Sequence, residues 1–488
     1  MTDMPVLHWK TAQKEYTLLF EGTPKVADLL REQGIPFPAP CGGKGTCGKC
    51  AAVLEGAVSA PNEAEKKAGC RLACQAVLLG EAWGAPLRED APFARVEGTD
   101  YRPDTPLQGI SAAIDIGTTT VALKVFGEDG SLLGEASGLN PQRVYAADVI
   151  GRIDAALKGK GEELQNAILD RMDTLLTTAC QAGGIEKEDI VFFVVTGNTA
   201  MLYLLTGRSP ASIAAFPFRS ETLFGETWEL FGKPAYLPPC MNAFVGADIT
   251  CALLASGMCE KEETALLCDV GTNGEIALWK DGKLYVTSTA AGPAFEGAEI
   301  SRGCGYIPGA VDRLWMANGK LYAHTVGDLP AVGICGSGLL DAVACFLESE
   351  ELDETGAMDG DFLPIAGDVT LTQKDVRALQ LAKAAIAAGM EILLARAGVK
   401  EQEIAAVYLA GGFGTHLSPE SAVKIGLLPR SFLGKIIPLG NAALQGACML
   451  LGAPAPREKC NSLAASSIHV ELGGSADFND AFVEHMFF

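Results

Sequence analysis

Ala112-Ala-Ile-Asp-Ile-Gly-Thr-Thr-Thr120 is an apolar run that ends in a turn of glycine and threonine. The same Asp-[Ile/Val]-Gly-Thr core returns in Leu266-Leu-Cys-Asp-Val-Gly-Thr-Asn-Gly274, and Ala405-Ala-Val-Tyr-Leu-Ala-Gly-Gly-Phe413 ends in paired glycines. Short apolar runs bounded by glycine are typical of buried strands, and helical segments separate these three. The sequence therefore predicts a layered α/β architecture built from two related halves.

The turns themselves predict a nucleotide site. No Gly-Lys-[Ser/Thr] follows either turn, so neither is a Walker loop. Tight strand-to-helix turns without a ligand are one interpretation. In their order, however, the two turns and the Gly-Gly-Phe strand end resemble the acetate and sugar kinase, Hsp70 and actin superfamily of ATPases, whose two RNase H-like halves close over the nucleotide.

That resemblance implies roles for individual residues. Asp115 and Asp269 would hold Mg2+ directly or through water, since carboxylate and water oxygens suit this cation. Glu275 and Glu296 are candidates for positioning the attacking water. The remaining implied nucleotide contacts are Gly117, Thr118, Thr119, Gly271, Thr272 and Asn273 to phosphates, and Gly411, Gly412 and Phe413 to adenosine.

Two other segments have open roles. Ile334-Cys-Gly-Ser-Gly-Leu-Leu-Asp341 places Gly336 and Ser337 either against the nucleotide or in a close-packed helix start. Lys383 is a candidate for a nucleotide or partner contact, although a lysine on a helix is more often solvated.

Five cysteines gather near the N-terminus, three of them in Cys41-Gly-Gly-Lys-Gly-Thr-Cys47-Gly-Lys-Cys50. The glycines let this loop wrap tightly and aim N–H groups at an anion. Iron-sulfur binding is favoured over structural zinc, because zinc sites normally use two compact cysteine pairs. The spacing resembles 2Fe-2S ferredoxins of the adrenodoxin and putidaredoxin type, a small α+β (β-grasp) fold. This implies the ligands Cys41, Cys47, Cys50 and Cys74, with Cys70 spare.

Composition excludes several classes of function. The 488 residues carry a net charge of -22, and no Lys/Arg-rich run is present, which argues against a nucleic-acid partner. No uninterrupted apolar window reaches the length of a membrane span, and the start has no signal-peptide pattern. We expect a cytoplasmic protein without membrane contact. The odd count of 15 cysteines indicates thiols or metal ligands rather than disulfides.

These patterns divide the chain into four parts. We expect a ferredoxin domain at 1–84, a proline-containing linker at 85–109, a middle domain with the first phosphate turn at 110–205, and a C-terminal actin-like ATPase domain at 206–488.

The whole chain resembles the reductive activators of corrinoid proteins. The segments that carry this resemblance, besides the motifs above, are 140–153, Thr196-Gly-Asn-Thr-Ala-Met201, Ala290-Ala-Gly-Pro-Ala-Phe-Glu-Gly297 and 380–386. It implies a homodimer that uses ATP, Mg2+ and a 2Fe-2S cluster to pass one electron from a low-potential donor to Co(II), restoring methyl-accepting Co(I). Without a cysteine-rich C-terminal tail, the chain resembles the bacterial branch, which serves methyltransferase or acetyl-CoA pathway corrinoid proteins. The alternatives are an ATP-dependent reductase of another low-potential metallocentre and a non-enzymatic, nucleotide-sensing ferredoxin fusion.

Overall fold

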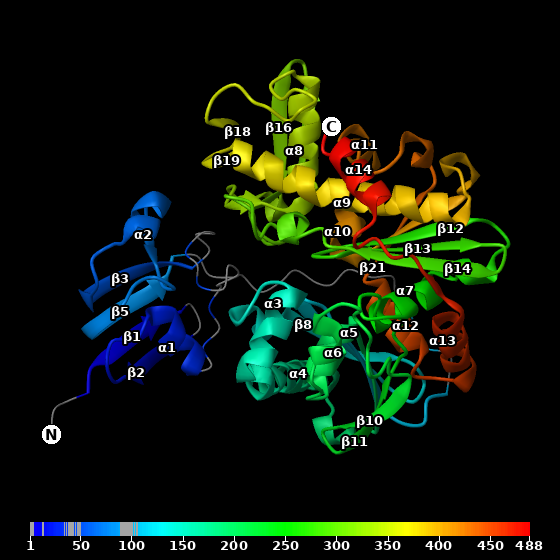
Figure 1. Cartoon of the computed structure of the whole chain (residues 1–488). Coiled ribbons are helices and arrows are strands. Elements are labelled where there is room, and N and C mark those ends of the chain that lie inside the picture. Colours follow the sequence, from blue (N-terminus) through cyan, green and yellow to red (C-terminus); the bar gives the residue numbers. More distant parts are fainter. Residues whose placement is uncertain are drawn as a thin grey trace.

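The computed structural model has three main sheets in separate parts of the molecule: one in an N-terminal domain and one in each of two halves that follow (Figure 1). The structure describes residues 4–11, 14–33, 35, 37, 43, 45, 50–87, 101, 103 and 106–488. Of the predicted linker, residues 88–100, 102 and 104–105 lie outside this set.

The N-terminal domain is the small α+β unit that the sequence predicts. Its five-stranded sheet has the order β2-β1-β5-β3-β4 and packs against a core that includes Leu7, Trp9 and Leu30. The strand that follows Cys74 begins only at Leu78, because the N–H groups of Gln75 and Ala76 both donate to the Leu72 carbonyl and form a turn. The elements are β1 (Val6–Lys10), β2 (Glu15–Leu19), α1 (Val26–Glu32), β3 (Ala51–Val58), α2 (Glu63–Ala68), β4 (Arg71–Leu72) and β5 (Leu78–Pro86).

The first half is built on the sheet β10-β11-β9-β6-β7-β8. Its central strand β6 (Ser111–Ile116) is buried along its whole length, as its apolar sequence requires. The other elements are β7 (Thr120–Phe126), β8 (Leu132–Leu139), η1 (Pro141–Val144), α3 (Val149–Ala155), η2 (Ala156–Lys160), α4 (Gly161–Gly183), η3 (Lys187–Asp189), β9 (Phe192–Gly197), α5 (Thr199–Leu205), α6 (Ala211–Ala214), β10 (Glu226–Leu230), β11 (Lys233–Leu237), α7 (Ala247–Ser256) and η4 (Met258–Glu260).

The second half repeats this topology in the sheet β21-β20-β12-β13-β14-β22. In each half a central strand, β6 or β12 (Ala265–Val270), pairs antiparallel with the next strand and parallel with β9 or β20 (Ala406–Ala410). The other strands are β13 (Gly274–Lys280), β14 (Lys283–Thr289), β15 (Ala310–Ala317), β16 (Lys320–Thr325), β17 (Gly333–Ile334), β18 (Phe362–Ala366), β19 (Val369–Thr372), β21 (Ile436–Gly440) and β22 (Ile468–His469). The prediction of two related halves is confirmed.

The helices of the second half are η5 (Pro293–Glu296), η6 (Val326–Asp328), α8 (Gly336–Glu348), α9 (Gln373–Ala397), η7 (Glu401–Glu403), α10 (Gly411–His416), α11 (Pro419–Lys424), η8 (Arg430–Phe432), α12 (Ala442–Met449), α13 (Pro454–Ser466) and α14 (Ala476–Glu484). Among the described residues, α9 is the one helix whose length and composition would let it cross a membrane. It is a core helix here, since 78% of its most apolar stretch is buried and α14 lies along it (Figure 1).

The predicted boundary at residue 205 is wrong. The strands β10 and β11 follow it, yet β11 pairs parallel with β9 and thereby extends the sheet of the first half. After β11 the chain enters α7, which packs against the sheets of both halves together with α12. Gly446 allows the two helices to cross closely, because a Cβ there would lie 2.0 Å from the Cys251 carbonyl oxygen. The two helices begin at the junction between the halves.

Candidate functional site

The N-terminal domain brings together two of the predicted cluster ligands. Cys50 ends the glycine loop, Cys74 follows β4, and their Sγ atoms are 3.1 Å apart. Both residues are buried, and the Ala73 N–H donates to the Cys50 carbonyl. Two converging buried sulfurs fit an iron-sulfur cluster, which thiolates hold from several points of the chain. Cys41 and Cys47 lie outside the described residues.

Gln75 connects the Cys74 segment to the glycine loop. Its side-chain amide donates to the Gly43 carbonyl at 2.7 Å and lies 3.5 Å from the Cys74 sulfur. Its Oε1 accepts from Asn62, so the amide orientation is fixed. Hydrogen bonds to ligand sulfurs and to the loop around them tune an iron-sulfur centre. Cys70, the spare cysteine, instead lines a large cavity described below.

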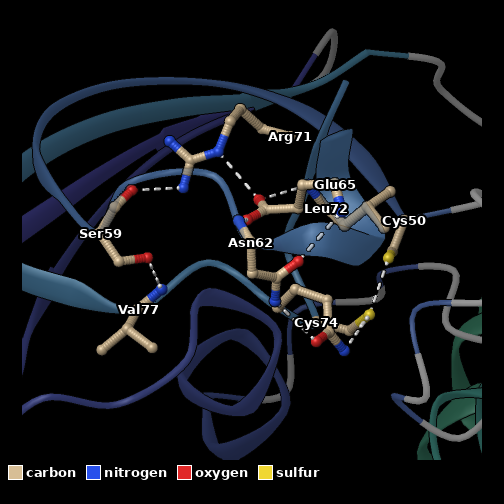
Figure 2. A network of polar contacts seen from close by, with 9 residues as sticks. Cys50, Ser59, Asn62, Glu65, Arg71, Leu72, Cys74 and Val77 are labelled. Carbon is tan, nitrogen blue, oxygen red and sulfur yellow. Dashed lines mark hydrogen bonds and ion pairs between the residues drawn. The ribbon is translucent and has the colours of Figure 1, made fainter. Parts of the chain in front are cut away.

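A buried ion pair holds the Cys74 segment in place (Figure 2). Glu65 accepts from Arg71 Nε at 2.8 Å and from the backbone N–H groups of Leu72 and Asn62 at 3.0 Å each. Arg71 also donates to the Ser59 carbonyl. Burial alone would raise the pKa of Glu65, but these hydrogen bonds and the charge of Arg71 outweigh it and hold the pKa below its ordinary value.

Replacing Glu65 by alanine is expected to destabilise the N-terminal domain by about 3 kcal/mol, because it leaves Arg71 and two N–H donors without their acceptor. Since the folded-state pKa of Glu65 is lowered, its contribution is present above the unfolded pKa and is lost as the pH falls through the folded value. Urea unfolding followed by cluster absorbance measures both effects. Glu63→Ala is the matched control on the same helix, since that side chain is 91% exposed. Equal losses in the two variants would contradict the prediction.

The second site is a cavity of about 1760 Å³ between the halves. All the nucleotide-site residues predicted from the motifs line it: Asp115, Gly117, Thr118, Thr119, Asp269, Gly271, Thr272, Asn273, Glu275, Gly336, Ser337, Gly411, Gly412 and Phe413. Asp115 lies in β6 and Asp269 in β12, at matching places just before the strands turn. The repeated strand-and-turn unit therefore presents two equivalent surfaces to one space.

Backbone geometry fixes both turns and the glycine end of β20. The Gly117 N–H donates to the Thr120 carbonyl, and the Gly271 N–H donates to the Asn273 carbonyl. Gly411 has φ +84°, and a Cβ there would lie 2.6 Å from Asp269 Oδ1. Only glycine therefore lets β20 end directly beside this carboxylate.

Among the carboxylates that line the cavity, those of Asp115 and Glu275 are buried, and those of Asp248 and Asp269 are partly buried. Burial, together with the charge of Asp269, raises the pKa of Asp115 to about 7, although a hydrogen bond from Asn441 lowers it. Burial and the neighbouring charges of Asp248 and Glu296 raise the pKa of Asp269 to about 7. Burial and the charge of Asp115 raise the pKa of Asp248 to about 7. Burial and the charges of Asp248 and Asp269 also raise the pKa of Glu275.

A divalent cation would relieve this repulsion, because it supplies the positive charge that buried carboxylates need to stay ionised. Among the described residues no three acidic, histidine or cysteine side chains are grouped so as to hold a metal by themselves, so two carboxylates with water oxygens would form the donor set, which suits Mg2+. The residues therefore fit the metal that an ATP site requires.

Hydroxyl, amide and guanidinium groups also line the cavity. Asn198 Nδ2 donates to Thr118 Oγ1 at 3.2 Å, and Thr119 Oγ1 donates to Glu296 at 2.5 Å. Beneath the first turn, the fully buried Arg152 donates through Nη2 to the Thr118 carbonyl at 2.5 Å. Burial lowers the pKa of this guanidinium to about 9, while the charge of Glu296 raises it. A positive charge is thus held directly behind the first phosphate turn.

The two segments with open roles both take part in packing. The Ser337 hydroxyl donates to the Asp312 carbonyl, and a Cβ at Gly336 would lie 2.0 Å from the Phe295 carbonyl oxygen. Both residues reach the cavity, but the turn itself serves the close-packed start of α8. Lys383 is buried, and its ammonium donates to the Phe487 carbonyl beside the ring of Phe488. It supports the C-terminal segment instead of the nucleotide.

Sequence reasoning missed several polar residues of the cavity. Asp248 lies in the first turn of α7, and Asn441 is the N-cap of α12, where its side chain donates to Asp115 at 2.9 Å. No motif marks either residue, because each reaches the site from a helix start far along the chain. Asn198 and Arg152 lie in segments that the family resemblance singled out, without a role assigned.

Comparison with known proteins agrees with this two-part organisation. The family model for the 2Fe-2S iron-sulfur cluster binding domain matches residues 11–79, the RACo middle region matches 110–261, and the C-terminal domain of RACo, the ASKHA domain, matches 263–488. The corrinoid activation enzyme RamQ of Eubacterium limosum is 32% identical over 428 residues, which cover 79% of this chain and 71% of that protein. The chain belongs to the family of corrinoid activation enzymes.

Two further relatives extend the likeness. The solved structure of a reductive activator for corrinoid, iron-sulfur protein superposes with a TM-score of 0.72 at 25% identity, covering 99% of this activator and 98% of that chain. The [Co(II) methylated amine-specific corrinoid protein] reductase of Methanosarcina barkeri is 28% identical over 249 residues, 46% of each chain. The predicted ferredoxin and actin-like ATPase folds of this activator, and its use of a 2Fe-2S cluster, ATP and Mg2+, are confirmed.

Proposed function

We propose that this chain is an ATP-dependent reductase that returns the Co(II) form of a corrinoid protein to the methyl-accepting Co(I) form. The observation that carries the proposal is the presence, in one chain, of a buried cysteine pair suited to a one-electron cluster and a two-half cavity suited to Mg-ATP. A bound 2Fe-2S cluster supplies single electrons. The names of the relatives identify corrinoid proteins as the class of acceptor.

The residues of the nucleotide cavity have separate roles in binding the cation, the phosphates and the attacking water. Asp115 and Asp269 hold the cation, with Asn441 orienting Asp115 through its hydrogen bond. Thr118, Thr119, Thr272 and Asn273 supply phosphate donors from both halves. Glu275 lies opposite Asp269 on the neighbouring strand and, with the partly buried Asp248, is a candidate to orient the attacking water. Because the donors belong to different halves, phosphate binding draws the halves together.

The cluster domain borders the same cavity. Gly45 of the cluster loop, Lys67 of α2 and Cys70 line it together with the nucleotide residues. A change in the angle between the halves therefore changes the surface against which the cluster domain lies. This arrangement supports a role of ATP in selecting the conformation that transfers the electron, since a ligand shifts a conformational equilibrium through its differential affinity.

The partners follow from the same proposal. The acceptor is a corrinoid protein of a methyltransferase or acetyl-CoA pathway system, and a low-potential donor loads the cluster in the cytoplasm. The net charge of -22 favours a partner with a basic or neutral docking face. We also expect a homodimer, which sedimentation of the purified protein at several concentrations tests.

The direct test is anaerobic visible spectroscopy of a Co(II) corrinoid protein, encoded near this gene, mixed with the pre-reduced full-length protein. We expect the Co(I) band with Mg-ATP and no Co(I) band without nucleotide. A parallel reaction with Mg-AMPPNP separates the effect of nucleotide binding from that of hydrolysis. Absence of Co(I) with every neighbouring corrinoid protein, while ATP still binds, would exclude cobalt as the acceptor.

A further inference from the structure

Glu296 bridges the two phosphate turns across the cavity. Its Oε2 accepts from Thr119 Oγ1 of the first turn at 2.5 Å and from Thr272 Oγ1 of the second turn at 3.0 Å. Its Oε1 accepts from the backbone N–H of Thr272 at 3.2 Å. Glu296 itself ends η5, 24 residues beyond Thr272 and 177 beyond Thr119. One carboxylate thus ties a residue of the first half to the second half.

The groups that hold this carboxylate are the ones that suit a phosphate. Hydroxyls and N–H groups at strand-to-helix turns bind phosphate oxygens, and here they converge from both halves on an internal anion. The guanidinium of Arg152 lies behind the first turn, on the Thr118 carbonyl, and completes the positive surroundings. A carboxylate, planar with one negative charge, satisfies these donors in part, whereas a phosphate offers more oxygens and more charge.

We propose that Glu296 is an internal competitor for the terminal phosphate of a nucleoside triphosphate. When the cavity holds no nucleotide, its carboxylate occupies the donors of Thr119 and Thr272; the terminal phosphate displaces it and takes those donors. A diphosphate leaves the carboxylate in place. This inference rests on the proposed use of ATP and adds how the protein distinguishes ATP from ADP.

The exchange explains how phosphate binding is converted into motion. In the carboxylate-bound state the halves are joined through the backbone of the 293–297 segment, and in the phosphate-bound state through the nucleotide. The two states therefore differ in the position of η5 relative to the first turn. Such a difference is what allows a ligand to shift a conformational equilibrium.

The test is calorimetric titration of the full-length, cluster-containing protein with Mg-AMPPNP and with Mg-ADP. Glu296→Gln keeps the size of the side chain but removes its charge. We expect about tenfold tighter binding of Mg-AMPPNP, because the phosphate then no longer displaces a charged hydrogen-bond acceptor. Binding of Mg-ADP should change by less than about twofold. Glu296→Asp keeps the charge but shortens the reach, and it should give a smaller gain. Glu262→Gln, an exposed acid outside the lining of the cavity, is the matched control.

Other outcomes are decisive as well. Unchanged or weaker Mg-AMPPNP binding in Glu296→Gln would overturn the competitor role, and together with slower ATP turnover it would assign Glu296 to the attacking water. If Glu296→Gln increased the affinity for both nucleotides equally, the carboxylate would not compete with the terminal phosphate specifically. If the unaltered protein binds neither nucleotide, the proposed use of ATP fails first, so the two failures are distinguishable.

Discussion

Replacing Asp269 by asparagine is expected to lower the rate of ATP turnover by about a thousandfold, because the transition state loses several kcal/mol of stabilisation by the metal. Asp269 is partly buried near the end of β12, and Gly411 leaves room for its carboxylate at the end of β20. Asparagine has the same shape but lacks the charge that holds the cation. ATP turnover measured over a range of Mg2+ concentrations tests this.

The same variant makes a second prediction that separates charge from folding. Burial, together with the charges of the neighbouring carboxylates Asp248 and Glu296, raises the pKa of Asp269. Without Mg2+ and nucleotide, Asp269→Asn should therefore be at least as heat-stable as the unaltered protein, while its stabilisation by Mg-ATP is lost. Asp281→Asn, an exposed position with φ +49° that suits both side chains, is the control. Near-normal turnover in Asp269→Asn would contradict the assigned metal role.

Replacing Cys74 by alanine is expected to abolish the visible absorption of the cluster and to reduce the ATP-dependent electron transfer to background. The Cys74 sulfur faces Cys50 at 3.1 Å, whereas Cys70 precedes β4 and lines the cavity. Cys70→Ala should consequently keep normal iron content. Nucleotide binding, measured in both variants, should persist, because the turns that bind it lie in the two halves.

The double variant Cys70→Ala/Cys74→Ala controls for substitution of one cysteine by the other. If Cys74→Ala keeps part of the cluster and the double variant loses it, Cys70 has taken over a ligand position. Full iron content in Cys74→Ala and loss in Cys70→Ala would reverse the ligand assignment. Iron analysis and low-temperature electron paramagnetic resonance of the reduced protein distinguish these results.

The predictable part of the site consists of residues that are close in sequence. Asp115 and Asp269 each lie within a strand-and-turn unit that carries its own phosphate donors, so two copies of one motif identify them. Gly411 could likewise be predicted, because the paired glycines directly follow an apolar strand. The boundary at residue 205 failed for the complementary reason: β10 and β11 form a hairpin by themselves, and nothing local shows that β11 pairs with β9.

The sequence by itself determined the two chemistries, because a glycine loop with spaced cysteines and a strand ending in Asp-[Ile/Val]-Gly-Thr are local arrangements that short backbone segments fix. The tertiary structure decided which distant groups meet them. Asn441 reaches Asp115 across 326 residues, and Glu296 reaches Thr119 across 177. Such contacts depend on how the second half and α12 pack back against the first, which is set by the burial of whole helices and sheets rather than by any single motif.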